Sequence, residues 1–438
     1  MKGLQTKRQW DELGVQPCEI LLPNNHLNME KWAVVACDQY TSEPDYWRDV
    51  DSLVGNAPST LRLILPEVYL GTASEKERID LVKKAMQDYL ANDTFKVFPR
   101  GGVLVERTCG GKTRTGLLLA IDLEKYDYRE GSSSLIRPTE GTILSRIPPR
   151  LRIRQDAPIE LPHVMVLLDD PCKTFIEPLR EHKSHMVYDF DLMKSGGHIR
   201  GYFIPEEDLE TVRGALSDIY DESCAAYSSP LLFAVGDGNH SLATAKANWE
   251  LLRQSIPEKE RIHHKARYAL VELVNVHDEG IVFEPIHRVL FNAPDAIGQL
   301  ENIFNEQNPD GVTVSVVGDA SKFRNVIKDG HVIPFISSEY PCGAICVQTP
   351  QSTLHVATLQ NALDSYLAQN SSAYIDYIHG DAVVRKLSQE HNIGFFLPPI
   401  AKQTLFPYIA QFGALPRKTF SMGQANEKRY YLECREII

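Results

Sequence analysis

Five consecutive residues combine the side-chain types that binding a phosphate group and moving a proton require. Gly236 and Gly238 let the backbone adopt positive φ, so that free N–H groups at the start of a following helix point at an anion, usually a phosphate. Asp237 can hold a Mg²⁺ ion that neutralises phosphate charge, or accept a proton from a hydroxyl group. Asn239 adds a neutral hydrogen-bond donor and His240 a titratable group. The segment therefore predicts a phosphate-binding site in which Asp237 and His240 are catalytic and Asp237 is the metal ligand.

The elements around this segment are expected to position it at the end of a strand. An apolar run at 231–235 predicts a strand directly before the loop, and apolar residues at 241–252 lie on one stripe of a helix. We therefore expect the loop to follow the carboxyl end of a strand and to open a helix. The alternative for a bare Gly-Asp-Gly sequence is a tight turn, with His240 capping the helix.

Composition and charge narrow the class of protein. With 438 residues, 43% of them hydrophobic, the chain can bury more than one core, so we expect more than one domain. The net charge of −12 is spread without a long charged run, which argues against nucleic acid or an anionic membrane as partner and favours a small-molecule substrate. No stretch approaches the ~18 apolar residues of a membrane span and the start is polar, so we expect a cytoplasmic protein. The eight cysteines are scattered, which favours reduced thiols over a zinc site.

Strand and helix patterns occur along the whole chain and indicate a mixed α/β (α+β) fold. Helices are expected at 75–90, 206–226, 296–304, 382–387 and 403–411, and strands at 95–98, 102–106, 115–122, 163–168, 186–190, 199–204, 268–276, 281–290, 312–317 and 430–434. We expect a catalytic core at 1–291 that contains the loop, a small α/β lobe at 292–370, and a C-terminal segment at 371–438 that returns to the core.

Two further loops carry basic side chains that could bind a substrate. A glycine turn at 195–197 precedes His198 and Arg200, which can contact a carboxylate or a phosphate, although a plain hairpin turn is the simpler explanation. Lys418 and its neighbour Arg417 lie in a loop before the last strand, where a fixed basic pair could reach an anionic ligand. A solvated loop explains that pair equally well. His198, Arg200 and Lys418 are the candidate substrate-binding residues.

Four segments of the sequence resemble those of a known family. They are 32–44 (WAVVACDQYTSEP), 138–142 (PTEGT), 236–241 (GDGNHS) and 415–420 (LPRKTF). Over nearly its whole length the chain resembles the bacterial domain-of-unknown-function family 1015. The Asp-Gly-x-His loop of that family is in turn similar to the loop of the ParB/sulfiredoxin-like nucleotide-binding fold, which includes kinases that phosphorylate free L-serine. The resemblance implies a ParB/sulfiredoxin-like core with an additional small α/β lobe, Mg²⁺ with ATP or ADP, and nucleotide contacts from Gly236, Gly238, Asn239 and Ser241.

The same resemblance implies a catalytic base near the amino terminus. In the free serine kinases an acidic residue there acts on the acceptor hydroxyl, which makes Asp38 and Glu43 the candidates. Both follow an apolar run at 33–36 that predicts a buried strand. Glu43 has an alternative interpretation, because Ser42 and Pro44 are typical of a helix start in which Ser42 is the cap.

The loop departs from the ParB/sulfiredoxin-like pattern at one position. Those loops usually place an arginine directly after the histidine, whereas this chain has Ser241. Another arginine is expected to supply the positive charge, and the candidates are Arg146, Arg150, Arg152 and Arg154. The last three alternate, so a strand would present them on one face as nucleotide ligands. A solvated basic edge is the alternative for that row.

The loop and the resemblance together predict a nucleotide-dependent phosphotransferase that acts on a small hydroxyl metabolite, with free L-serine as the first candidate. Two alternatives remain open. One is a phosphate-ester hydrolase in which Asp237 and His240 activate a water molecule. The other is a nucleotide-binding sensor without turnover.

Overall fold

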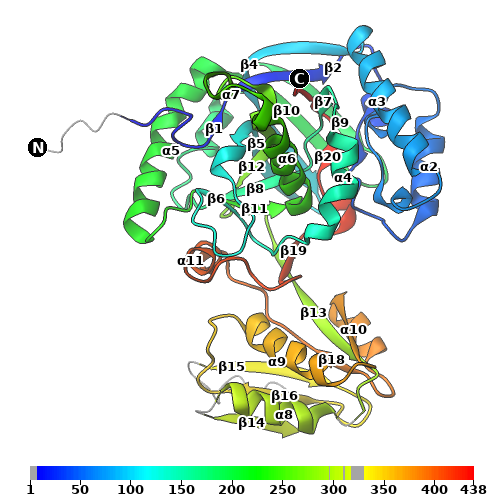
Figure 1. Cartoon of the computed structure of the whole chain (residues 1–438), viewed down its shortest axis with the longest axis vertical. Coiled ribbons are helices and arrows are strands. Elements are labelled where there is room, and N and C mark those ends of the chain that lie inside the picture. Colours follow the sequence, from blue (N-terminus) through cyan, green and yellow to red (C-terminus); the bar gives the residue numbers. More distant parts are fainter. Residues whose placement is uncertain (1–6, 295, 309–310, 317–329) are drawn as a thin grey trace, which may run out of the picture. The chain divides into compact units, whose positions relative to one another are not determined.

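The chain forms two compact units in a computed structural model that describes residues 7–294, 296–308, 311–316 and 330–438 (Figure 1). Unit 1 comprises the residues up to Val282 together with Ile409–Ala414 and Met422–Ile438, and unit 2 comprises Phe283–Tyr408 and Leu415–Ser421. The first segment of unit 1 ends at Val282, nine residues before the domain boundary expected at 291. Of the segment 371–438, which was expected to return to the core, residues 371–408 and 415–421 belong to unit 2, and residues 409–414 and 422–438 belong to unit 1.

Among the described residues of unit 1, ten strands form one mixed sheet in the order β6-β11-β8-β12-β5-β4-β10-β9, with β1 beside β5 and β2 beside β4. These strands are β1 Val15–Gln16, β2 Cys18–Pro23, β4 Phe95–Cys109, β5 Lys112–Asp122, β6 Ile136–Pro138, β8 Met165–Leu168, β9 Met186–Leu192, β10 Gly197–Pro205, β11 Phe233–Asp237 and β12 Tyr268–Asn275. Strand β12 is buried along its whole length because strands flank it on both sides and apolar layers cover both faces.

The longer helices of unit 1 contribute buried apolar residues to the cores that cover this sheet. They are α1 Met29–Trp32, α2 Pro44–Val54, α3 Glu75–Ala91, α4 Ile147–Arg154, α5 Glu206–Ala226, α6 Asn239–Leu252 and α7 Glu258–Arg261. Helix α6 places Leu242, Ala245 and Trp249 in the same apolar core as Val166 of β8 and Leu119 of β5. This packing fixes the start of α6 relative to the strands.

The carboxyl-terminal residues pair with two earlier segments of the chain through short strands. Strand β20 (Tyr430–Tyr431) pairs with β3 (Val34–Val35), and β21 (Arg435–Glu436) pairs with β7 (Ile159–Glu160). Residues far apart in the sequence therefore lie side by side near β3.

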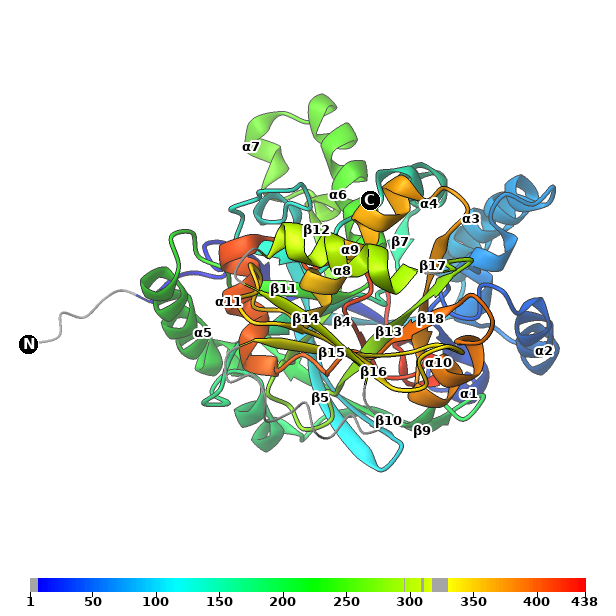
Figure 2. The same ribbon diagram turned by 90° about the horizontal axis from the view of Figure 1, so that it is seen from below.

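Unit 2 has a second mixed α/β arrangement (Figure 2). Among its described residues the strand order is β14-β16-β15-β18-β13-β17, with β19 beside β13. The strands are β13 Phe283–Phe291, β14 Val312–Val316, β15 His331–Ile336, β16 Gly343–Val347, β17 Tyr374–His379, β18 Ile393–Phe395 and β19 Phe420–Met422. Helices α8 (Ala296–Gln307) and α9 (His355–Gln369) pack on each other, α10 (Asp381–Leu387) packs on β13, and α11 spans Lys402–Phe412.

The observed elements confirm the mixed α/β prediction, with two local corrections. The strands expected at 95–98 and 102–106 are one continuous strand, β4. The row of alternating arginines at 150–154 is not a strand but lies in α4, because the prolines at its start favour the first turn of a helix. The last residue of the strand expected at 312–317 lies outside the described residues. Among the described residues, no helix combines the length and apolar content of a membrane span.

Candidate functional site

The glycine loop lies where the sequence predicts it, between the end of β11 and the start of α6. Strand β11 ends at Asp237, Gly238 occupies the N-cap position with φ of 78°, and α6 begins at Asn239. A Cβ atom on Gly236 would lie 2.8 Å from Met422, and one on Gly238 would lie 3.0 Å from Val164. Both glycines are therefore needed for close packing, and Gly238 also for its left-handed backbone conformation.

Asp237 forms an ion pair with a lysine that the sequence did not single out. Its Oδ1 accepts a hydrogen bond from the Gly238 N–H at 2.9 Å, and its Oδ2 lies 3.1 Å from Nζ of Lys428. The side chains of Lys428 and Asp237 are only 12% and 23% exposed, so the pair is weakly screened by solvent. The ion pair joins the start of α6 to the segment just before β20.

Asp38 belongs to the same charged group. It follows β3, and Nε2 of Gln39 donates to its Oδ1 at 3.0 Å. Burial would raise the pKa of Asp38, but His163, the hydrogen bond from Gln39 and the charge of Lys428 together hold it below the ordinary value. Asp38 and Asp237 therefore both lie within the electrostatic reach of Lys428, and we call these three residues the Asp–Lys–Asp cluster.

A buried hydrogen-bonded group lies next to Asp38. The Tyr431 hydroxyl is 2.9 Å from Nδ1 of His163 and donates to Sγ of Cys37 at 3.0 Å. Burial raises the pKa of the Cys37 thiol above its ordinary range, and the neighbouring Asp38 raises it further. Cys37 is therefore a neutral thiol, and the charge in this region is carried by Asp38.

Of the three alternating arginines at 150, 152 and 154, only Arg150 approaches this region. Arg150 pairs with Glu67. Burial raises the pKa of Glu67, Arg150 opposes this, and Asp38 adds to it, so Glu67 and Asp38 are electrostatic neighbours. Helix α4, which carries Arg150, packs against α6.

Arg152 and Arg154 have other partners. Arg152 pairs with Glu75 of α3, and Arg154 pairs with the buried Glu160 of β7. The expectation of three arginines on one face is therefore wrong, because in a helix Arg152 points to the side opposite Arg150 and Arg154.

The segment after β6 lies over the start of α6. The Thr139 hydroxyl donates to the Val235 carbonyl at 2.7 Å, and the Ile143 N–H donates to Nε2 of His240 at 3.2 Å. In this arrangement Nε2 of His240 is the hydrogen-bond acceptor. Within the described part of the chain, Oγ1 of Thr142 and Oδ1 of Asn239 are buried without a hydrogen-bond partner.

The remaining candidates lie apart from the Asp–Lys–Asp cluster or add nothing to it. Ser241 is half-buried in the first turn of α6. Glu43 is the exposed N-cap residue of α2, so the predicted helix start is present, but the cap is not Ser42. His198 contacts Asp191 and Asp189 at 2.6 and 2.5 Å, and Arg200 contacts Asp189 at 3.0 Å, all on the β9–β10 hairpin.

Lys418 is in unit 2 and has a different environment. Its backbone has φ of 53°, and its carbonyl accepts a hydrogen bond at 2.9 Å from Arg288, a fully buried arginine. Arg288 also donates to the carbonyl of Arg417 at 2.8 Å. The loop backbone is held in place while the side chains of Arg417 and Lys418 are exposed.

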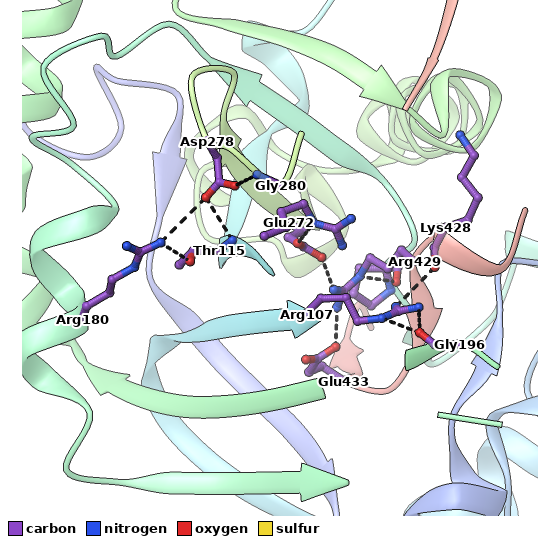
Figure 3. A network of polar contacts seen from close by, with 12 residues as sticks. Arg107, Thr115, Arg180, Gly196, Glu272, Asp278, Gly280, Lys428, Arg429 and Glu433 are labelled. Atoms are coloured by element: carbon purple, nitrogen blue, oxygen red, sulfur yellow. Dashed lines mark hydrogen bonds and ion pairs between the residues drawn. The ribbon is translucent and has the colours of Figure 1, made fainter. Parts of the chain in front are cut away.

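A buried ion network fixes the backbone that carries Lys428 (Figure 3). Arg429 pairs with Glu272 of β12 and with Glu433, and its Nε donates to the Pro162 carbonyl at 3.1 Å. Burial would lower the pKa of Arg429, but the two glutamates outweigh this and raise it. Arg107 donates to the carbonyl of Lys428 at 3.4 Å. The position of Lys428 therefore depends on charges in the core of unit 1.

A family model for a protein of unknown function, DUF1015, matches residues 16–396. The chain belongs to the DUF1015 family. This confirms the resemblance carried by the four sequence segments. No curated protein matches the sequence significantly.

Solved structures share only distant similarity with this DUF1015 chain. A free serine kinase in complex with AMP is 10% identical, covers 73% of this chain and 91% of its own, and gives a TM-score of 0.36. A conserved hypothetical protein from Pyrococcus furiosus is 10% identical, with coverages of 72% and 90% and a TM-score of 0.34. SbnI from Staphylococcus aureus, truncated at its carboxyl terminus, is 9% identical, with coverages of 70% and 82% and a TM-score of 0.35. Similarity at this level assigns neither fold nor function.

The carboxylates of the Asp–Lys–Asp cluster suit a cation whose other ligands are water molecules and phosphate oxygens. Mg²⁺ is usually held by one or two protein carboxylates, with water and phosphate oxygens completing the octahedron. Asp237 and Asp38 supply two such carboxylates. Within the described ranges, no group of three His, Cys, Asp or Glu side chains could form a metal site made of protein ligands alone.

Sequence reasoning missed Lys428, His163, Tyr431 and Glu67. Each reaches the site through tertiary contacts with residues far away in the chain, and none belongs to a short motif. The one available signal was the segment 32–44, which contains Asp38 and contributed to the family resemblance.

Proposed function

We propose that this DUF1015 chain is a nucleotide-dependent phosphotransferase whose acceptor is a small hydroxyl metabolite, with free L-serine as the first candidate. The observation that supports this most is the convergence of Asp38 and Asp237, from two distant segments, on Lys428 at the amino end of α6. The ParB/sulfiredoxin-like core is part of the same proposal.

Phosphoryl transfer depends mainly on positioning and on neutralising charge, and the cluster offers groups for both. The first N–H groups of α6 have no partner within the helix, and the helix dipole favours a negative charge there. In the proposal the loop residues Gly236, Gly238, Asn239 and Ser241 bind the phosphates of ATP or ADP. Asp237 holds Mg²⁺, which would neutralise phosphate charge when bound.

Asp38 is the proposed base toward the acceptor. Its lowered pKa keeps it ionised at neutral pH, so it can accept a hydrogen bond from a hydroxyl and orient the oxygen for attack. Glu43 is exposed and its charge acts on Tyr40 and Tyr46 instead. Of the two carboxylates considered, Asp38 is therefore the better supported.

One observation disfavours the hydrolase in which His240 activates water. Nε2 of His240 accepts the Ile143 N–H, so this nitrogen cannot also take a proton from water while the segment after β6 keeps its place. We assign His240 a positioning role, holding that segment over the start of α6.

The test is direct product analysis. The protein is incubated with L-serine, Mg²⁺ and either ATP or ADP, and O-phosphoserine is measured by mass spectrometry, with Asp237→Asn as the inactive control. Thermal shifts with each nucleotide show binding independently of turnover, because a ligand specific to the native state raises the melting temperature. Nucleotide binding without phosphoserine would exclude serine and leave another hydroxyl acceptor or a sensing role. Absence of both would reject the proposal.

A further inference from the structure

Lys428 occupies the place where a metal-dependent phosphotransferase would need a cation. Its ammonium group lies 3.1 Å from Asp237 and acts on Asp38 as well, so one positive charge is shared between two carboxylates. Two carboxylates near each other and near a bound phosphate would otherwise repel both each other and the ligand. In the described structure Lys428 therefore offsets part of the negative charge of the cluster.

The backbone of Lys428 is fixed while its side chain keeps four rotatable bonds. Arg429, the next residue, is locked between Glu272 and Glu433, and Arg107 donates to the carbonyl groups of Lys428 and, at 3.0 Å, of Asn426 (Figure 3). A lysine side chain is a flexible stem with a compact charge at its end. The ammonium group can therefore change partners without any change in the fold.

Two buried polar atoms near the same helix start indicate that a ligand completes the site. Oδ1 of Asn239 and Oγ1 of Thr142 are buried without partners in the described structure, which is costly unless another molecule supplies the hydrogen bonds. Asn239 is the first residue of α6, and Thr142 directly precedes the Ile143 N–H that binds His240. The residue after His240 is Ser241, so the loop itself places no cationic side chain directly after the histidine.

We propose that Lys428 is an internal counter-ion, which holds Asp38 and Asp237 in the metal-free protein and moves to a phosphate group of the nucleotide when Mg²⁺ binds Asp237, so that Asp38 is left to face the acceptor hydroxyl. This inference rests on the proposed nucleotide binding at the loop. Lys428 thereby supplies positive charge to the phosphates from outside the loop, whose residue after His240 is Ser241. No covalent bond changes, and the divalent cation offsets most of the negative charge that the phosphates bring.

The proposal predicts that one substitution at Lys428 raises the affinity for the metal and lowers the affinity for the nucleotide. Lys428→Met removes the charge and keeps most of the stem. Mn²⁺, a spectroscopic probe for Mg²⁺, is titrated alone by electron paramagnetic resonance and should bind roughly fivefold tighter, because the competing ammonium is gone. ADP, titrated calorimetrically with Mg²⁺ present, should bind roughly tenfold to a hundredfold more weakly, because a charged hydrogen bond to phosphate is lost.

The matched control is Lys246→Met, which removes another lysine that pairs with a carboxylate, Glu250, on the same helix. Both affinities should stay unchanged in this variant. Lys428→Gln repeats the test if the methionine variant does not fold, as judged by circular dichroism. A fall in both affinities would show a structural role and overturn the inference, as would no change in either or the absence of any Mn²⁺ binding by the unsubstituted protein.

The binding readout separates this inference from the proposed activity. Opposite shifts in the two affinities without any phosphoserine would leave the counter-ion in place and remove the serine kinase. If the protein forms phosphoserine but Lys428→Met leaves both affinities unchanged, the proposed kinase activity stands and the counter-ion role of Lys428 is rejected.

Discussion

Two glycine turns in unit 1 carry a histidine and several charges, yet they differ in where the partners come from. At the β9–β10 hairpin, His198 and Arg200 pair with Asp189 and Asp191 of the neighbouring strand, and these groups are largely exposed. At the loop before α6, Asp237 pairs with Lys428, which comes from the far end of the chain and is mostly buried.

The difference teaches which kind of glycine turn is a candidate for chemistry. Partners on the same hairpin satisfy each other in water, where an exposed ion pair contributes little. Charged partners from distant segments that are buried away from water interact more strongly, because the effective dielectric constant is lower there. Only the complete fold holds such partners together. Convergence from distant segments, rather than the motif itself, makes the Asp–Lys–Asp cluster the candidate site.

The largest expected effect separates the two turns by activity. Asp237→Asn should lower the rate of phosphoryl transfer by roughly 10²–10⁴-fold while the protein stays folded, because the variant loses the charge proposed to hold Mg²⁺. His198→Gln should leave the rate within about twofold, since a surface pair is not used. Steady-state kinetics with circular dichroism as the folding control decides between them. Equal rates for the two variants would contradict the assignment of the active site to the Asp237 loop rather than to the hairpin.

The next effect concerns stability and the network that positions Lys428. Arg429→Met leaves Glu272 and Glu433 buried without their shared partner, and removing one member of a buried ion pair costs about 3–5 kcal/mol. Arg200→Met on the hairpin should cost less than about 1 kcal/mol. Urea unfolding monitored by fluorescence measures both values. A loss below 1 kcal/mol for Arg429→Met would mean that the network does not anchor the site.

The acid dependence of stability should also differ between the regions. The pKa of Asp38 lies below its ordinary value of 3.8, so its contribution to stability is present above that pH and is lost as the pH falls through the lowered pKa. His198 and Arg200 lower the pKa of Asp189 in spite of the opposing effect of desolvation, which gives the same sign. Asp38→Asn should reduce the fall in the free energy of unfolding at acid pH, and it should do so at low and at high salt. Asp189→Asn should reduce this acid-induced fall only at low salt, because salt screens the interactions between exposed charges.

The smallest effect tests the candidate substrate residues directly. His198→Gln combined with Arg200→Gln should change the Michaelis constant for the acceptor by less than about twofold, because both side chains already pair with Asp189. A selective rise of that constant with an unchanged rate constant would return the hairpin to the substrate site.

Local patterns predicted much of the fold because they depend on neighbours in sequence. The expected helix at 206–226 has the bounds of α5, and the order strand, glycine loop, helix around Asp237 is observed. The strand expected at 150–154 is wrong because alternation over five residues fits a strand, whereas Pro148 and Pro149 suit a helix start. Periodicity over so short a run does not decide between the two.

The site was only partly predictable for a different reason. Asp237 and Asp38 stand in recognisable segments, but Lys428 is one lysine among 46 basic residues, and nothing in its neighbourhood marks it. Its role depends on the pairing of β20 with β3 and on Arg429 in the core, which are contacts between the two ends of the chain. Such long-range contacts leave no signal in a single sequence.

A crystal structure of the protein with Mg²⁺ and ADP tests the central claim most directly. The account predicts a phosphate group at the start of α6 within hydrogen-bond distance of Lys428 Nζ, with Asp237 bound to the metal. Nucleotide bound elsewhere, or a Lys428–Asp237 ion pair that persists unchanged beside bound MgADP, would contradict it.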